Sequence, residues 1–188
     1  FKQKTAYEML RSLVGSEMCI RDRLYFVETR AAEQRALLCE WVESYYESGR
    51  KVQVLTDSTL AAQHLDRMLW TFSQSSFIPH RIHIPTDGEI EEEEPVIISV
   101  GEVFLAGVEA LVCDVSASLH FIERYPLVVH FIVQDEPERL QGSRLLWQQA
   151  KEKKMKMQHV PYASNQPRVG PVPGDRQRFS SRRSRSVE

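Results

Sequence analysis

Apolar positions along the chain alternate between short continuous runs and runs with helical spacing. The largely apolar runs, which are typical of buried strands, cover 24–27, 96–100, 110–115 and 127–133. The segment 51–56 is also strand-like, and a short alternating strand covers 81–84. Between them, apolar residues recur at i, i+3, i+4 and i+7, as at Leu38, Trp41, Val42 and Tyr45. This alternation predicts an α/β fold with three layers, in which helices cover both faces of a mostly parallel sheet.

Turn and cap residues set the expected limits of the first two helices. The first is predicted over 31–48, where Gly49 suits the position just after a helix end. The second is predicted over 59–70, with Asp57 or Ser58 as its N-cap. Its expected buried face carries Ala61, Leu65, Met68 and Leu69.

Composition divides the chain into a central domain, 24–162, and two outer segments. Residues 1–23 contain KTAYEMLRSLVGSEMCIRDR, which resembles translated sequencing-adaptor DNA, so we interpret them as a non-native segment; the alternative is a short amphipathic helix. Residues 163–188 are rich in Pro, Ser and Arg and are predicted to be disordered. Their basic end, 180–186, is either a solvated tail, the favoured interpretation, or a weak nucleic-acid contact.

Charge and hydropathy narrow the range of partners. The chain has a net charge of −2, but 1–23 carries +2 and 164–188 carries +4, which leaves −8 on the central residues. Such a domain repels phosphate backbones, so DNA is expected only as an indirect partner. No apolar run approaches the roughly 20 residues of a membrane helix, and no secretory signal is apparent. The three cysteines are widely spaced, which suits reduced thiols in the cytoplasm.

The motifs of common enzyme classes are missing. The sequence contains no glycine-rich phosphate loop, no nucleophile elbow and no zinc-protease motif. His80 and His83 are interpreted as ordinary histidines, and the acidic run 91–94 as a solvated loop. Asp114 ends a strand and is a candidate catalytic carboxylate, but it has no basic partner nearby in sequence. We therefore expect no catalytic, metal or cofactor site; the alternative is a small nucleotide- or cofactor-dependent enzyme on the same sheet.

Two groups of residues are candidates for protein binding. Trp70 and Phe77 lie at the end of a helix and in the next loop, where large aromatics are either core or interface anchors; periodicity alone favours core. The last helix, predicted over 137–157, is basic although the domain is acidic. Four of its residues recur at i, i+3, i+4 and i+7 and combine charge with an aromatic ring: Arg144, Trp147, Gln148 and Lys151. Such a stripe suits an acidic peptide with an apolar end. The alternative is that this side of the helix only faces solvent.

At these two places the sequence resembles the chi subunit of bacterial DNA polymerase III. The segment LDRMLWTFSQSSFIPH is similar to that family's pattern of Leu-Asp and Leu-Trp followed by Ser-Phe-x-Pro-His. Upstream, LYFVETRAAEQRALLCEWVESYYESGRKVQVLTDS resembles its opening strand, helix and second strand. Downstream, PVIIS, EALVCDVS and YPLVVHFIV resemble its later strands. The resemblance covers roughly 135 residues. It implies a fold similar to nucleotide-binding α/β proteins but without their phosphate loop, which agrees with the missing glycine motifs.

The resemblance implies a non-catalytic replication subunit with two protein partners. The psi subunit, which links the family to the clamp loader, would bind a surface on which Trp70 and Phe77 are partly exposed. The residues of this surface would be Leu65, Leu69, Trp70, Phe77, Pro79 and His80. The acidic C-terminal tail of single-stranded-DNA-binding protein would bind Ile132, Arg139, Arg144, Trp147, Gln148 and Lys151.

The last helix departs from the family pattern at two positions. Leu146 and Gln148 stand where the family usually has basic residues, which predicts a weaker tail site. The location implied by the resemblance is the bacterial cytoplasm.

Overall fold

The structure, a computed structural model, describes residues 23–72, 77–84 and 94–162. The predictions for the first 22 residues, for 91–93 of the acidic run and for the tail after Tyr162 lie outside these ranges. Arg23 opens the first described strand, one residue before the predicted start of the domain. Within the described ranges no helix is long and apolar enough to cross a membrane.

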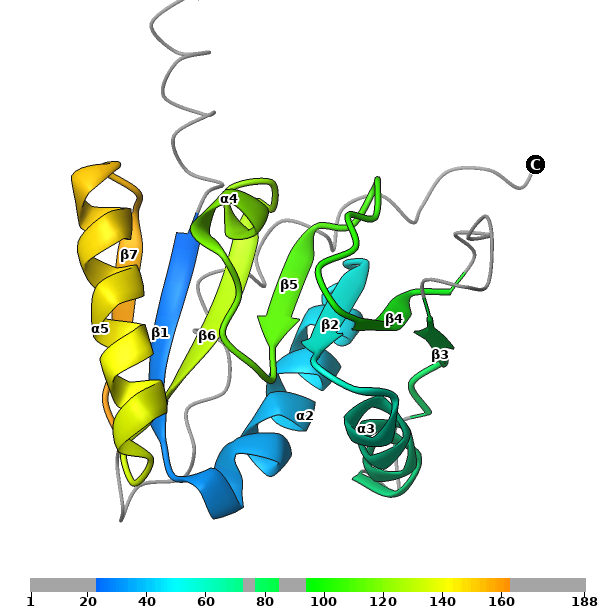
Figure 1. Cartoon of the computed structure of the whole chain (residues 1–188). Coiled ribbons are helices and arrows are strands. Elements are labelled where there is room, and N and C mark those ends of the chain that lie inside the picture. Colours follow the sequence, from blue (N-terminus) through cyan, green and yellow to red (C-terminus); the bar gives the residue numbers. More distant parts are fainter. Residues whose placement is uncertain (1–22, 73–76, 85–93, 163–188) are drawn as a thin grey trace, which may run out of the picture.

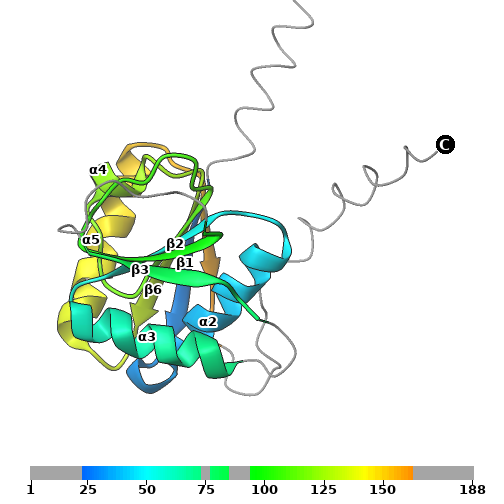
Figure 2. The same cartoon turned by 90° about the vertical axis from the view of Figure 1, so that its right-hand side faces the viewer.

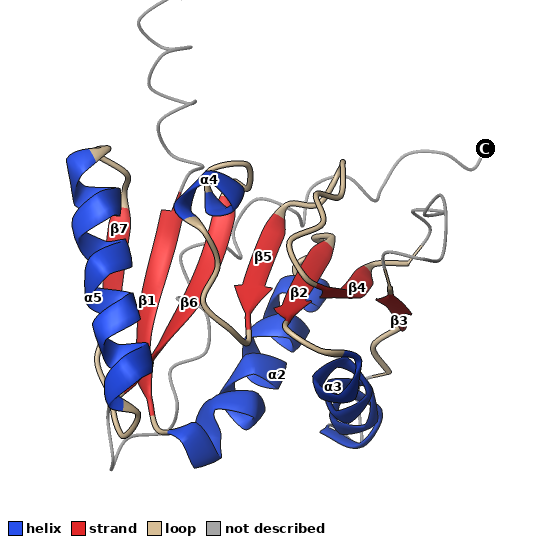
Figure 3. Ribbon diagram, viewed as in Figure 1, coloured by secondary structure: helices blue, strands red, loops and turns tan. Residues whose placement is uncertain are grey.

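All strand pairs of the seven-stranded sheet are parallel, and the order across it is β3-β4-β2-β5-β6-β1-β7 (Figures 1 and 3). The prediction of a mostly parallel sheet is therefore confirmed. The strands are β1 (Arg23–Thr29), β2 (Val52–Thr56), β3 (His80–His83), β4 (Val96–Val100), β5 (Ala110–Cys113), β6 (Leu127–Val133) and β7 (Met157–Val160).

Helices α2 (Ala31–Glu47) and α3 (Thr59–Phe72) cover one face of the sheet. Both predicted helical faces are correct: Leu38, Trp41, Val42 and Tyr45 of α2 are buried, as are Ala61, Leu65 and Leu69 of α3. Gly49 has a φ of +79° just after α2, the left-handed conformation that glycine adopts readily. The Ser58 hydroxyl accepts a hydrogen bond from the amide of Ala61 and so caps α3.

Helices α4 (Leu119–Ile122) and α5 (Pro137–Glu152) lie on the opposite face, which completes the three layers (Figure 2). A second apolar cluster fills this side, with Leu146 and Ala150 of α5 packed over β1 and β6. A buried polar group lies under the loop between β4 and β5. There Gln53 donates to Ser99 Oγ and to the carbonyl of Val103, both at 2.8 Å, and accepts from the hydroxyl of Tyr125 at 2.8 Å.

The end of the domain differs from the prediction. A helix was expected to run to Met157, but α5 ends at Glu152 and the chain turns through Lys154, whose φ is +56°. It then forms β7, which pairs with β1 from Leu24 to Val27. The sequence does not indicate this turn, because lysine is common in helices as well as in turns and edge strands. The residues concerned are Lys153, Lys154 and Lys156.

Candidate functional site

The structure places Trp70 and Phe77 together on the surface at the β3 edge of the sheet. Trp70, at the end of α3, is 52% exposed, and Phe77, just before β3, is 65% exposed. Their ring centroids are 5.1 Å apart and the rings are tilted by 57°, a favourable aromatic pairing. The expectation that both are partly exposed is confirmed, and the core interpretation from periodicity is wrong for this pair. We call Trp70, Phe77 and the half-buried Pro79 the aromatic surface.

The remaining residues of the predicted psi site support this surface from below. The imidazole of His80 is fully buried, and its ring centroid lies 5.0 Å from that of Trp70. Its Nδ1 is 2.8 Å from the carbonyl oxygen of Ile78, and its Nε2 is 3.2 Å from the Asp66 carboxylate. Leu65 and Leu69 are buried in the core beneath α3, so a partner would meet them only through the residues above.

A second candidate surface lies on α5 near β7, at the other edge of the sheet. Arg144, Gln148 and Lys151 are exposed along α5, and Trp147 between them is half-buried; we call these four residues the basic stripe. The indole packs against Phe26 of β1, with ring centroids 4.7 Å apart, and it faces His159 of β7 at 6.3 Å. The stripe therefore combines charged groups in solvent with an aromatic ring held firmly against the sheet.

The structure assigns different surroundings to two other predicted tail-site residues. Arg139 donates a hydrogen bond of 2.9 Å to the carbonyl of Asp114 and one of 3.2 Å to Glu136, so its guanidinium is held at the carboxyl end of the sheet. Ile132 is half-buried against the second apolar cluster. Leu146, one of the two departures from the family pattern, is buried in that cluster, so it changes the packing of α5 and not the exposed stripe.

Residues that sequence reasoning missed fasten β7 beside the stripe. Glu28 of β1 binds His159 with one carboxylate oxygen at 3.0 Å and accepts from the amide of Tyr162 with the other, also at 3.0 Å. The Arg30 guanidinium lies 5.3 Å from the centre of the Tyr162 ring. These partners are more than 100 residues apart in sequence, so no local pattern could have indicated them.

Asp114 acquires basic partners through the fold, although none is near in sequence. Its carboxylate lies 3.5 Å from the Arg35 guanidinium and 3.2 Å from the Gln34 side-chain nitrogen. Burial raises the pKa of Asp114 above its ordinary value, and the positive charges of Arg35 and Arg139 offset part of that rise. The carboxylate is thus held by cations and an amide, which is an ordinary arrangement for a buried structural carboxylate.

The other candidates for chemistry lie in unreactive surroundings. Burial raises the pKa of the Cys39 thiol to about 12 and also raises that of Cys113, so neither forms a thiolate at neutral pH. His130 is buried against Ser143, and burial lowers its pKa to about 4. No group of three or more possible metal ligands occurs within 23–72, 77–84 and 94–162.

Comparison with solved structures supports the fold. The chain is similar to Mss116p DEAD-box helicase domain 2 bound to an RNA duplex, with 15% identity, a TM-score of 0.53 and coverage of 76% of this chain and 65% of that one. It is also similar to S. cerevisiae dbp5 l327v bound to gle1 h337r and ip6, with 14% identity, a TM-score of 0.53 and coverage of 75% and 42%. The chain thus spans less than two thirds of either structure, and these likenesses concern the fold alone.

Comparison of the sequence with protein families identifies the function class. No curated protein matches the chain. Residues 22–158, however, match the family of the DNA polymerase III chi subunit, HolC, and this stretch includes both the aromatic surface and the basic stripe. The chain therefore belongs to the DNA polymerase III chi subunit family, whose members are accessory subunits in DNA replication.

Proposed function

We propose that the chain is a non-catalytic adaptor that binds the psi subunit through the aromatic surface and the acidic tail of single-stranded-DNA-binding protein through the basic stripe. Through psi it would be linked to the clamp loader, in the bacterial cytoplasm. The main support is the exposed ring pair of Trp70 and Phe77, in the segment that resembles the family signature. Exposed tryptophan and phenylalanine are costly in a lone soluble domain, but they are common anchors at protein interfaces.

The position of the two surfaces supports a role in joining two partners. The aromatic surface lies where α3 leads into β3, and the basic stripe lies beside β7 (Figure 1). β3 and β7 are the two edge strands of the sheet. Six strand spacings of about 4.8 Å separate them, or roughly 29 Å. Two partners at that separation bind without touching the same residues.

The basic stripe has the chemistry that an acidic peptide requires. Arg144 is exposed and offers a guanidinium fork to a carboxylate. Lys151 adds attraction at longer range, and the ring of Trp147 offers an apolar face to an aromatic peptide end. Because the charged groups lie in solvent, each contact contributes about 1 kcal/mol or less, which corresponds to micromolar binding at best.

A three-component binding experiment tests the proposal. Purified psi, the chain and a fluorescent peptide ending in the acidic tail should form a 1:1:1 complex in size-exclusion chromatography with light scattering. Because the two surfaces lie at opposite edges, saturating psi should leave the peptide's Kd within about twofold, as expected for sites that share no residues. Competition between psi and the peptide, or no binding of either, would contradict the proposal.

A further inference from the structure

A cleft at the carboxyl end of the sheet belongs to neither proposed surface. It consists of two hollows of about 450 and 500 Å³ that share Arg35, Asp57 and His64 in their walls. Each volume lies in the range of small-molecule sites, roughly 300–1,000 Å³. The walls are formed by the start of α2, by one side of α3 from Leu60 to Met68, and by the segments that follow β2, β5 and β6.

The topology of the sheet explains why a cleft opens at this place. The connection after β2 leads to α3 on one face, whereas the connection after the neighbouring β5 leads to α4 on the other. Similarly, β1 leads to α2 and the neighbouring β6 leads to α5, on opposite faces. In open parallel sheets, ligands bind where neighbouring connections diverge in this way.

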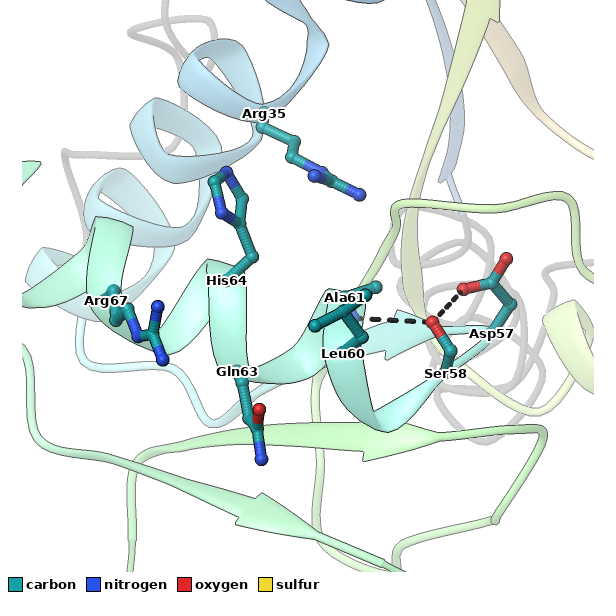
Figure 4. Close-up of a pocket in the computed structure, with 8 residues that line it drawn as sticks. All are labelled: Arg35, Asp57, Ser58, Leu60, Ala61, Gln63, His64 and Arg67. Atoms are coloured by element: carbon teal, nitrogen blue, oxygen red, sulfur yellow. Dashed lines mark hydrogen bonds between the residues drawn. The ribbon is translucent and has the colours of Figure 1, made fainter.

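One of the hollows has two arginines and a histidine among the residues that line it. Arg35 of α2 and His64 of α3 reach into the same space, with Asp57 and Ser58 across from them (Figure 4). Arg67, one turn further along α3, lines the same hollow. Within the described residues, neither the His64 nor the Arg67 side chain has a hydrogen-bond or ion-pair partner. Two arginines that line a hollow create a local attraction for anions, even on an acidic domain, although Asp114 compensates part of the charge of Arg35.

The other hollow offers oxygen acceptors instead. Asp57, Asp114 and Glu136 line it, together with Gln34. Arg35 and Arg139 contact Asp114, so part of its negative charge is compensated. Carboxylate and amide oxygens at this end suit the hydroxyl or amino groups of a ligand whose anionic end lies in the first hollow.

We propose that this cleft binds a small phosphorylated molecule that carries hydroxyl or amino groups. Its phosphate lies against Arg35 and His64, with Arg67 adding positive charge at the rim, and its hydroxyl or amino end faces Asp57 and Asp114. Arginine pairs with phosphate through two parallel hydrogen bonds. Side chains would therefore hold the phosphate here, in place of the backbone amides that hold it in a phosphate loop. The site involves binding only and does not depend on psi or on the acidic tail.

Titration of the full chain with ribose 5-phosphate, ribose and inorganic phosphate, followed by NMR of the amides of α3, tests the proposal. Ribose 5-phosphate should bind with a Kd of about 10 mM or below, because several charged hydrogen bonds form. It should bind more tightly than inorganic phosphate, and ribose alone should not bind. No shift with ribose 5-phosphate, or equal shifts with ribose, would overturn the proposal.

Variants place the site without disturbing the core. His64→Ala should weaken ribose 5-phosphate binding about tenfold, because it removes the imidazole donor, and Arg35→Lys should do the same while keeping a positive charge beside Asp114. Asp57→Asn should strengthen binding severalfold, since it removes a negative charge from the cleft. The matched control is Arg81→Lys on β3, an exposed arginine outside the cleft, which should leave ribose 5-phosphate binding unchanged. Loss of binding in Arg81→Lys, or indifference to the three cleft variants, would place the phosphate elsewhere.

Discussion

The ring centroids of Trp70 and Phe77 lie 5.1 Å apart, and more than half of each residue is exposed. Truncating a buried interface anchor costs about 2–4 kcal/mol of binding free energy. We therefore expect Phe77→Ala to weaken psi binding by about 30-fold or more, measured by isothermal titration calorimetry. The free energy of unfolding should hardly change, because Phe77 buries little of its own surface in the isolated chain.

The matched control for this variant is Leu145→Ala. Leu145 is also a large, exposed apolar residue, but it lies on α5, away from the aromatic surface. It should leave both psi binding and stability unchanged. If Phe77→Ala unfolds the domain and spares psi binding, the aromatic pair is a structural feature and not an interface.

A second prediction concerns the basic stripe. Arg144→Ala should abolish measurable binding of the acidic tail peptide, because it removes the one exposed guanidinium of the stripe. Gln148→Lys should strengthen binding severalfold, since it adds a positive charge one turn from Arg144. Fluorescence anisotropy at increasing NaCl measures both, and affinity should fall steeply with salt. Binding that is indifferent to both changes and to salt would place the tail site elsewhere.

A third prediction follows from the buried histidine of β6. Burial lowers the pKa of His130 from 6.5 to about 4. Between these values the unfolded chain binds a proton that the folded chain does not, so the free energy of unfolding decreases as the pH falls. The loss from His130 alone should reach roughly 3 kcal/mol at pH 4. Urea unfolding at several pH values measures it.

The pH experiment compares two variants that each lack one histidine, so that only the position of the missing residue differs. His130→Gln removes the titrating group and should flatten the decline between pH 6.5 and about 4. His120→Gln removes an exposed histidine and should leave the decline intact. Equal slopes for the two variants would show that other groups cause the acid sensitivity.

The fourth prediction tests the polar group under the loop between β4 and β5. Gln53→Leu removes the acceptor of the Tyr125 hydroxyl and a donor to Ser99, so buried polar atoms lose their partners. The free energy of unfolding should fall by roughly 2–4 kcal/mol. Adding Tyr125→Phe should recover part of this loss, because the stranded hydroxyl is gone. A double-mutant cycle by urea unfolding measures the coupling, and strictly additive losses would contradict it.

Most of the fold could be predicted because its elements carry local patterns. The runs at 96–100 and 127–133 are apolar except for Ser99 and His130, as suits strands buried on both faces, and the α2 and α3 faces repeat at helical spacing. β7 could not, because an edge strand of four half-exposed or exposed residues has no apolar run. Its place is set by pairing with β1, a long-range contact that no local window contains.

The candidate surfaces were only partly predictable, for a related reason. Periodicity indicates which side of a helix is apolar, but not where the helix ends relative to the sheet. Trp70 follows the buried Leu69 but points away from the buried face of α3, so it is exposed although Phe72, further along the helix, still packs against the core. Likewise Arg139 is drawn to Asp114, and only the packing of α5 across β6 brings those two residues together.

The place of β1 between β6 and β7 affects how the protein is made. β1 leaves the ribosome before every other strand, yet its two neighbours are the last strands to be synthesised. Its hydrogen-bonding groups therefore lack their native strand partners until β6 and then β7 have been made, although Tyr25 and Val27 can already pack against α2. Such long-range closure slows folding and lengthens the time for which apolar chain is open to aggregation. The nascent domain thus depends on synthesis as far as β7, and a chain cut short before β6 cannot close the centre of its sheet.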